Sequence, residues 1–509
     1  MKYLKDCIFL LSVFVLMIGS IHAQNEKTPA WVKDLIVYEV STKSFNSPKI
    51  PERGTFKSVR EKIPYMQKLG INAIWLTGNS WADSKHFYNI WSQYAVIRQD
   101  SIDTSLGTRK EMRALIAEAH KHGIRVFLDV ITHGVMSYSP LVKEHPDWFK
   151  GGSWGMTDFD WQGGHADLDE WWVKTFTDYV VNDGVDGFRL DVDIYRPDLW
   201  KRIRQNAVEA GHPVCIMSEN LISCRNAVDC YQRSNKLSEQ TMGLDYSNAS
   251  LTDMAAYFDE SQQFLKNWRE TDKIQQEEPD STIYTVQLSS HDDGWDSFPA
   301  QDNPYVAEGS RCVFGYSCLF SPMIPIFMSG EEFDADFVPI PRMKPDLFGK
   351  AENNNGTWLY GSWIDWSQLK QLHHKQMLDD VTRMIAIRKA NPDIFYGRSM
   401  DNPVGIVFVD MPENKSVPKP YLLYAKGSKA ILIAGNPTGQ TQVITCTVPK
   451  GILGFNKQDK IMVRDLWNDT GFATLLSADG TLTFTIAPDR TYRGGVAVFE
   501  LTAGSPSLF

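Results

Sequence analysis

The feature that most constrains this fold is a repeated alternation of short apolar runs with amphipathic stretches, which continues from about residue 35 to residue 390. The apolar runs have the length and the β-branched composition of buried strands, and the stretches between them have helical spacing. One unit shows the signals clearly: Thr108 and Glu111 form a capping box, Gly123 ends the helix, and residues 124–131 form the next strand. Strands that alternate with helices in this way predict a parallel sheet covered by helices.

Eight such units make up the alternating region. We expect their strands at residues 35–40, 71–77, 124–131, 188–193, 213–219, 237–245, 282–290 and 323–328. The sixth has the weakest pattern, and it is assigned to residues 237–245 because a strand is needed between the fifth and the seventh. Eight parallel strands that are each followed by a helix predict a closed (β/α)8 TIM barrel, an α/β fold.

Beyond residue 391, helical periodicity ends and short β-prone runs are punctuated by Gly, Asn, Asp and Pro. This pattern predicts a small all-β domain, an antiparallel sandwich. We therefore divide the mature chain into a catalytic barrel at residues 24–395, with a short insertion at about residues 134–167, and a C-terminal sandwich at residues 396–509.

The N-terminus has the pattern of a secretory signal peptide. A basic head is followed by an apolar run over residues 7–19 and by Ala23 at a plausible cleavage site. The run is shorter than the ~20 residues that span a bilayer, and no comparable run follows it. We expect residues 1–23 to be removed and the mature protein to be periplasmic or secreted, without a transmembrane segment. The alternative is an uncleaved membrane anchor.

Charge and cysteine content limit the partners. The chain has 62 acidic and 52 basic residues, a formal net charge of -10, and no basic run. This composition argues against nucleic acid and against an anionic membrane surface as partners. Six cysteines follow the signal peptide without the spacing of a metal site. Cys224 and Cys230 are close enough in sequence for a disulfide in an oxidising compartment, and buried free thiols are the alternative.

The fourth expected strand carries charges that a buried strand does not normally contain. Between Gly184 and Asp193, the apolar Phe188, Leu190 and Val192 alternate with Arg189, Asp191 and Asp193. Because side chains alternate across a strand, Arg189 and Asp191 share one face. Burying ions is unfavourable unless they are paired or hydrogen-bonded, so this face is either a structural ion pair or a constructed polar site.

Carboxylates also follow other expected strands. Asp129 ends the third strand, Glu219 ends the fifth, and His291-Asp292 follows the seventh. In a barrel of this kind, reactive groups lie at the carboxyl ends of the strands, so these side chains meet at one rim. Their mutual repulsion favours a functional site over a structural one.

Two carboxyl groups at this rim suit cleavage of a glycosidic bond, in which one protonates the leaving oxygen while the other attacks or stabilises the anomeric carbon. Glu219 has neutral neighbours, which would raise its pKa and make it the acid. Asp191 is kept ionised by Arg189 and suits the nucleophile.

These segments together resemble the alpha-amylase family of glycoside hydrolases, over essentially the whole mature chain. The matching motifs are Leu35-Ile-Val-Tyr38, His165-Ala-Asp-Leu-Asp169, Gly187-Phe-Arg-Leu-Asp191, Ser218-Glu219-Asn220, Ser290-His-Asp-Asp293 and Pro325-Ile-Phe-Met-Ser-Gly-Glu331. The resemblance implies Asp191 as nucleophile, Glu219 as general acid/base and Asp292 as transition-state stabiliser, in a retaining mechanism through a covalent glycosyl-enzyme. It also implies that Arg189 and His291 support sugar binding. We add as candidate substrate-binding residues Asp129, Tyr88 and His133.

This sequence departs from the family's first motif. The family has Asp, three residues, Asn and His, whereas Asp129-Val-Ile-Thr-His133-Gly134 has His in place of Asn and Gly in place of His. Because that Asn is often a calcium ligand, we expect no calcium at this position and no other cofactor or metal. His133 either reaches the sugar from one residue earlier or is a buried structural histidine. The segment around Tyr88 also lacks the Asp that usually precedes Tyr94.

The expected function is hydrolysis of α-glucosidic bonds in starch-like oligo- or polysaccharides by an alpha-amylase-like α-glycosidase. A transglycosylase or sugar isomerase would use the same covalent intermediate, and no sequence feature separates these activities. A non-catalytic glycan-binding protein is the third interpretation, which the intact Asp191, Glu219 and Asp292 disfavour.

Overall fold

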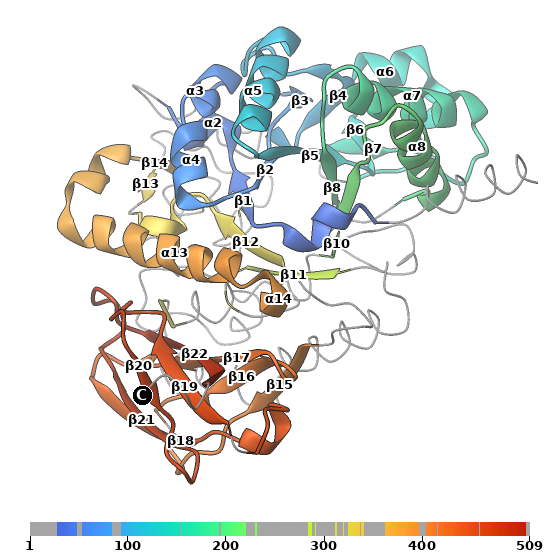
Figure 1. Ribbon diagram of the computed structural model, residues 1–509. Coiled ribbons are helices and arrows are strands. Elements are labelled where there is room, and N and C mark those ends of the chain that lie inside the picture. The colour runs from blue at the N-terminus through green and yellow to red at the C-terminus, as the bar shows by residue number, and fades with distance from the viewer. Residues whose placement is uncertain are drawn as a thin grey trace, which may run out of the picture.

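The computed structural model describes residues 28–47, 53–83, 93–153, 155–192, 195–219, 230–231, 283–287, 291, 311–312, 319, 324–335, 337–339, 362–395, 404–414, 416–457 and 459–504. These residues form a barrel surrounded by helices and a β domain that follows it in the chain (Figure 1). The long helix α13 (Leu372–Ala390) lies on the side of the barrel that faces the β domain. The predicted signal peptide and the predicted boundary at residue 396 lie outside the described residues.

Eight parallel strands form the closed barrel. In order around the ring they are β1 (Val37–Val40), β2 (Ala73–Leu76), β5 (Arg125–Ile131), β8 (Gly187–Asp191), β9 (Cys215–Ser218), β10 (Cys230–Tyr231), β11 (Ile283–Gln287) and β12 (Ile324–Met328). The ring closes where β12 pairs with β1. The predicted (β/α)8 TIM barrel is therefore confirmed.

The sixth barrel strand is not where the sequence placed it. It is β10, whose two residues pair with Met217 and Ser218 of β9 on one side and with Ile283 and Tyr284 of β11 on the other. The prediction of this strand at residues 237–245 is wrong, because a two-residue strand is too short to show any periodicity. Cys230 thus belongs to the barrel wall, whereas Cys224 and any bond between the two lie outside the described residues.

Helices cover the outside of the barrel (Figure 1). They include α3 (Phe56–Arg60), α4 (Ile63–Leu69), α5 (Arg109–Lys121), α7 (Ala166–Val181), α8 (Pro197–Glu209) and α13. The predicted capping box of α5 is confirmed, because Thr108 and Glu111 each accept the other's backbone N–H. Gly70 ends α4 with a φ of 100°, and a Cβ there would lie 2.6 Å from Ile385 Cγ2 of α13. This close approach of two helices requires glycine.

Strands β1, β2, β5, β8, β9 and β12 are largely buried on both faces, as is usual for a sheet that is covered on both sides. Inside the ring, a small buried cluster is made of Val32, Leu35, Val37, Ala73, Trp75, Phe127, Cys215, Met217, Ile324 and Ile326. Outside it, Phe188 of β8 packs against Phe176 of α7 and Trp200 of α8, with ring centroids 5.3 and 5.7 Å apart.

Three small antiparallel pairs of the described residues lie between the barrel units, and the last of them in the chain joins β13 (Phe337–Pro339) to β14 (Ser362–Ile364). The first joins β3 (Ser80–Ala82) to β4 (Val96–Ile102), and the second joins β6 (Gly134–Met136) to β7 (Met156–Asp158). The second pair, with the short helices α6 (Pro140–Glu144) and η3 (Pro146–Trp148), makes up the predicted insertion between β5 and α7. The insertion therefore starts directly at the carboxyl end of β5.

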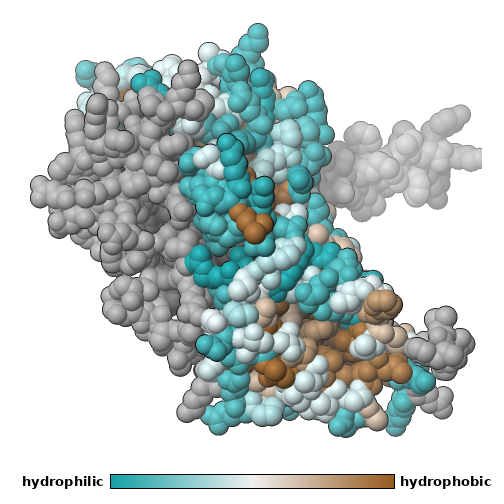
Figure 2. Space-filling model, turned by 90° about the vertical axis from the view of Figure 1, so that its left-hand side faces the viewer, coloured by the Kyte–Doolittle hydropathy of each residue, from teal (hydrophilic) through white to brown (hydrophobic). Residues whose placement is uncertain are grey.

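The C-terminal domain is all β, as predicted. A six-stranded antiparallel sheet has the order β15 (Val404–Phe408), β16 (Tyr421–Ala425), β17 (Lys429–Gly435), β22 (Val496–Gly504), β19 (Lys460–Asp465) and β20 (Ala473–Leu475). A second sheet pairs β18 (Gln442–Thr447) with β21 (Thr481–Ile486). Their facing residues share one core, which includes Leu432, Ile444 and Leu501. Figure 2 shows that exposed apolar residues gather on this lower domain, where Val443, Phe472 and Leu475 are exposed.

Among the described helices, none has both the length and the apolar character that a membrane span requires.

Candidate active site

Strand β8 provides the centre of the candidate site. Arg189 and Asp191 point into the barrel mouth, while Phe188 and Leu190 belong to the outer core against the helices. The predicted alternation is therefore confirmed from Phe188 to Asp191. The strand ends there, so Val192 does not continue it, and Asp193 lies outside the described residues. Arg189 is fully buried, so its charge has to be compensated by neighbouring groups.

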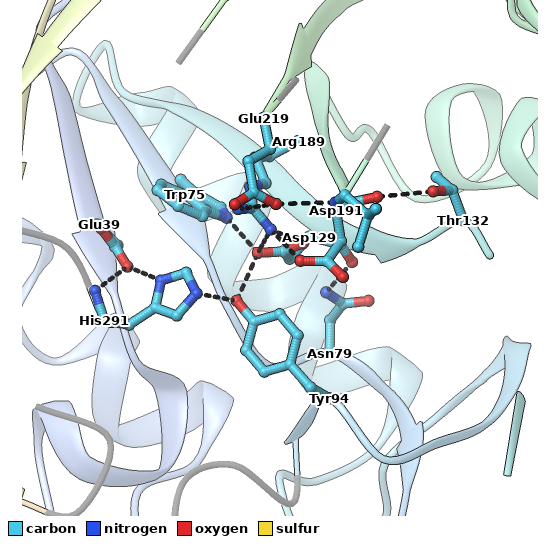
Figure 3. Close-up of polar contacts among 11 residues, drawn as sticks. Glu39, Trp75, Asn79, Tyr94, Asp129, Thr132, Arg189, Asp191, Glu219 and His291 are labelled. Atoms are coloured by element: carbon cyan, nitrogen blue, oxygen red, sulfur yellow. Dashed lines mark hydrogen bonds and ion pairs between the residues drawn. The ribbon is translucent and has the colours of Figure 1, made fainter. Parts of the chain in front are cut away.

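That compensation comes from carboxylates on three adjacent strands (Figure 3). Arg189 Nη1 lies 2.6 Å from Asp191 Oδ1 and 3.2 Å from Asp129 Oδ1 of β5. Its Nη2 lies 3.0 Å from Oε2 of Glu219, the residue that follows β9. Burial opposes the charged form of Arg189, but Asp129, Glu219 and Asp191 outweigh it and raise the pKa of the guanidinium well above its usual value. One buried cation thus holds three acids together.

The three acids differ in their surroundings. Asp129 is the most enclosed: its Oδ2 accepts hydrogen bonds from Trp75 Nε1 at 2.9 Å and from the Tyr94 hydroxyl at 2.8 Å. Its backbone oxygen accepts from Asn79 Nδ2 at 2.9 Å. Burial raises the pKa of Asp129, against the opposing charge of Arg189. With both carboxylate oxygens engaged by protein groups, Asp129 anchors Arg189; its predicted contact with the substrate stays a prediction.

Asp191 and Glu219 are the accessible members of the cluster. Their side chains are 15% and 17% exposed, against 2% for Asp129 and 0% for Arg189. Glu219 Oε2 also accepts the backbone N–H of Val192 at 2.8 Å. Two carboxylates at the ends of neighbouring strands therefore reach solvent while one guanidinium holds them in place.

The chain leaves β8 through a strained residue. Val192 has a φ of 64°, in the left-handed region that a β-branched residue rarely adopts. This turn aims the Val192 N–H at Glu219, and the Thr132 hydroxyl donates to the backbone oxygen of Asp191 at 2.7 Å. Backbone strain of this kind is maintained by the surrounding structure and is concentrated at functional sites.

His291 reaches the mouth from beyond β11. Its Nε2 lies 3.0 Å from the Tyr94 hydroxyl, and its Nδ1 and backbone N–H both face Glu39 Oε1 of β1 (Figure 3). The ring stacks on Tyr94 with centroids 5.1 Å apart and meets the Trp75 ring edge at 5.5 Å. His291 is thereby connected to Asp129 through Tyr94.

Sequence reasoning found part of this arrangement. It named Asp129, Arg189, Asp191, Glu219 and His291, which the structure brings together. It missed as site residues Glu39, Trp75, Asn79 and Tyr94. Glu39 carried a usable signal, because a carboxylate in the middle of an apolar strand is as unusual as Arg189 in β8. Tyr88 and Asp292 lie outside the described residues, so their predicted roles stay predictions.

Comparisons with known proteins agree with this geometry. A family model described as the alpha amylase catalytic domain matches residues 39–139, a segment that includes Glu39, Tyr94 and Asp129. A cyclomaltodextrinase from Bacillus sp is 25% identical over 236 residues, which is 38% of this chain and 41% of that enzyme. The crystal structure of a maltogenic alpha-amylase from Thermotoga neapolitana matches with a TM-score of 0.67 at 17% identity, over 93% of this chain and 99% of that chain. The chain is thus similar to members of the alpha-amylase family in part of its sequence and in its fold.

The sequence similarity to these proteins is low. An intracellular maltogenic amylase from Bacillus subtilis is 26% identical over 245 residues, which is 39% of this chain and 40% of that enzyme. The chain thus spans about two fifths of the length of the curated relatives that it matches. At 17% identity, the structural match to the Thermotoga enzyme shows a similar fold and nothing about activity.

His133, which replaces the usual Asn of the family, is directed to the insertion. Its Nδ1 lies 3.2 Å from Asp158 Oδ1 of β7, and its backbone oxygen accepts from the Phe159 N–H at 2.7 Å. These contacts attach the β6–β7 pair to the end of β5. The predicted contact of His133 with sugar stays a prediction.

The residues at the family's usual calcium position do not fit that ion. Calcium takes six to eight oxygen ligands, whereas His133 offers a ring nitrogen, and this nitrogen already faces Asp158. The nearby carboxylates have other partners, since Asp167 accepts from Trp148 and Asp169 pairs with Arg196. Within the described ranges, no group of three or more His, Cys, Asp or Glu side chains is placed to hold a metal ion.

Proposed function

We propose that this protein is a retaining glycoside hydrolase that cleaves α-glucosidic bonds in starch-like oligo- or polysaccharides. The observation that carries the proposal is the shared contact of Asp191 and Glu219 with Arg189, which holds two partly exposed carboxyl groups at the ends of adjacent barrel strands. Paired carboxyl groups of this kind are what glycosidic bond cleavage requires.

Both groups face Arg189, so the neutral surroundings expected for Glu219 from the sequence are not found. The two roles are assigned from the length and direction of the contacts. The 2.6 Å contact with Arg189 favours the ionised form of Asp191, which suits attack on the anomeric carbon. Glu219 Oε2 faces both Arg189 Nη2 and the Val192 N–H, so the proton of the acid form belongs on Oε1. Glu219 then protonates the leaving oxygen, and its carboxylate takes a proton from the water that releases the sugar from Asp191.

The substrate class is supported by the match to the alpha amylase catalytic domain and by the names of similar proteins. The similar enzymes are named a cyclomaltodextrinase and an intracellular maltogenic amylase, and these names refer to maltodextrin and to the formation of maltose. The neutral character of such sugars agrees with a chain that has no basic run.

The test is incubation of the purified protein with maltooligosaccharides, isomaltose, pullulan and trehalose, followed by separation of the products. Hydrolysis yields shorter sugars, transglycosylation yields longer ones, and isomerisation preserves mass. Proton NMR of the first-formed anomeric centre is expected to show the α configuration, because the mechanism displaces twice at that carbon. A β product would contradict retention, and binding without turnover would favour the glycan-binding alternative.

The proposal includes export. The basic head, the apolar run at residues 7–19 and Ala23 support cleavage of residues 1–23 and a periplasmic or secreted location. Expression of the full chain in a bacterium, followed by fractionation and N-terminal sequencing, is expected to give an exported protein that begins at Gln24. A cell-bound chain that begins at Met1 would support a membrane anchor instead.

A further inference from the structure

The inference concerns Glu39, a buried carboxylate that the proposed mechanism does not use. Glu39 and His291 are 1% and 2% exposed, although they are separated by 252 residues in the chain. Glu39 Oε1 accepts the backbone N–H of His291 at 3.2 Å and also faces Nδ1 of its ring. An isolated buried carboxylate is unfavourable, so the pair has to share a compensating charge.

The compensating charge follows from the hydrogens that Asp129, Tyr94 and His291 share in their hydrogen bonds. The Tyr94 hydroxyl lies between Asp129 Oδ2, at 2.8 Å, and His291 Nε2, at 3.0 Å, and it has one proton to donate. Asp129 Oδ2 also accepts from Trp75, and Oδ1 faces the permanent charge of Arg189, so this carboxylate is an acceptor. The Tyr94 proton therefore points to Asp129, and His291 Nε2 has to carry the hydrogen that points to Tyr94.

The second ring nitrogen of His291 faces a carboxylate. A carboxylate oxygen accepts hydrogen bonds, so Nδ1 also carries a hydrogen. With hydrogens on both nitrogens, the His291 ring is an imidazolium. Among the described residues, the titratable and charged groups on this side of the ring include Glu39 on β1, Tyr94 before β4 and, through Tyr94, Asp129 on β5 and Arg189 on β8.

We propose that Glu39 is a positioning residue that holds His291 in the doubly protonated form and thereby orients the hydrogen bonds from His291 through Tyr94 to Asp129. The buried ion pair and the stacking on Tyr94 fix the ring at the barrel mouth. Through Tyr94 and Asp129, this arrangement connects Arg189, and with it Asp191 and Glu219, to strand β1 (Figure 3). Its effect on catalysis rests on the proposed function, whereas the protonation of His291 can be measured without any substrate.

The substrate-independent test is nitrogen-15 NMR of the intact protein labelled in histidine, with the His291 signal assigned by its loss in His291→Gln. At pH 8 the wild type is expected to show both ring nitrogens protonated. In Glu39→Gln the amide oxygen still accepts from Nδ1 but supplies no charge, so the ring is expected to be neutral with one protonated nitrogen. A neutral His291 ring in the wild type would overturn the proposal, whatever the enzyme's activity.

The kinetic test compares Glu39→Gln with a matched control. Glu332 is also fully buried and accepts hydrogen bonds from the Tyr38 and Tyr65 hydroxyls at 2.7 and 2.6 Å, away from the cluster. In Glu39→Gln the alkaline limb of the kcat/KM profile is expected to move down by ~1 pH unit or more, because a neighbouring opposite charge is lost. Glu39→Asp keeps the charge, so the pH of its alkaline limb is expected to lie between those of Glu39→Gln and the wild type. Glu332→Gln is expected to leave the profile unchanged. Equal profiles for Glu39→Gln and Glu332→Gln would reduce Glu39 to a structural role.

Discussion

Two clusters of buried charge in this molecule differ in their balance of acids and bases. At the barrel mouth, Arg189 faces Asp129, Asp191 and Glu219. At the junction between the barrel and the C-terminal domain, Asp380 of α13 faces two arginines. In the first cluster three acids surround one cation. At the junction three arginines, Arg311, Arg490 and Arg493, face three acids, Asp334, Asp379 and Asp380, so the charges are balanced.

The junction cluster has the characteristics of a structural tie. Asp380 is fully buried; its Oδ2 lies 3.2 Å from Arg311 Nη1 and accepts the backbone N–H of Arg493 at 3.0 Å. Arg311 also donates to the Thr491 backbone oxygen, and Arg383 of α13 donates to Leu466 of the C-terminal domain. These bonds run between the two domains.

The comparison shows how burial alone fails to identify a site. Both clusters contain fully buried arginines or carboxylates, and both depend on contacts between distant parts of the chain. What distinguishes the mouth is that two of its acids are partly exposed and compete for one cation, which leaves reactive charge facing solvent. We therefore expect changes at the mouth to affect activity first, and changes at the junction to affect stability first.

The largest expected effect is on turnover. Asp191→Asn and Glu219→Gln keep the shape of each side chain but remove the charge or the proton that the mechanism needs, so each is expected to lower kcat by about 10³-fold or more. Asp380→Asn, the matched change at the junction, is expected to retain most of the activity. Kinetics on a maltooligosaccharide together with thermal unfolding would measure both quantities. A nearly active Asp191→Asn would remove Asp191 from the mechanism.

The next-largest effect is on stability, and it differs between Arg189 and Arg311. Arg189→Met leaves three carboxylates without their cation and is expected to lower the free energy of unfolding by ~3–5 kcal/mol. Arg311→Met is expected to cost less, because Asp380 keeps both the backbone N–H and the guanidinium of Arg493. Urea unfolding of both variants measures the difference, and Arg189→Lys serves as a variant that keeps the charge. An equal or larger loss in Arg311→Met would contradict the comparison.

A smaller effect concerns pH. Burial raises the pKa of Asp380 to about 7, against the charges of Arg311 and Arg493, whereas in an unfolded chain it is about 3.9. Between these values the folded protein binds a proton that the unfolded chain lacks, so this group makes stability fall as pH rises from about 4 to 7.

Asp380→Asn removes that titration. The wild type is therefore expected to lose up to a few kcal/mol of stability relative to Asp380→Asn between pH 5 and pH 8. Urea midpoints of both proteins at several pH values give the difference directly. If the wild type instead gains relative to the variant, the ionised carboxylate is stabilised by its arginines, and the junction is an ordinary buried salt bridge.

The smallest expected effect is that of calcium. A ligand that binds only the folded state raises stability by mass action, so removal of a structural ion lowers the melting temperature. His133 and Asp158 occupy the usual position with a histidine–carboxylate contact, and we propose that no structural calcium binds there. Thermal unfolding and activity are expected to be the same with a strong chelator and with added calcium. A drop of many degrees, restored specifically by calcium, would overturn this expectation.

Local signals in the sequence determined most of the architecture. The capping box of Thr108 and Glu111 places the start of α5, and the alternation from Phe188 to Asp191 separates the face of β8 that meets the helices from the face that meets the mouth. Both signals act within a few residues, where side-chain spacing follows directly from helix and strand geometry. The loss of helical periodicity beyond residue 391 likewise predicts the all-β domain.

Tertiary structure decided what local spacing does not encode. The sixth strand is two residues long, so its place in the ring depends on pairing with β9 and β11 and not on any pattern of its own. Glu39 meets His291 across 252 residues, and Asp380 meets Arg493 across 113. These contacts form only when the barrel closes and the domains pack. Burial then removes water from each charged group, and a buried charge is stable only beside a compensating group.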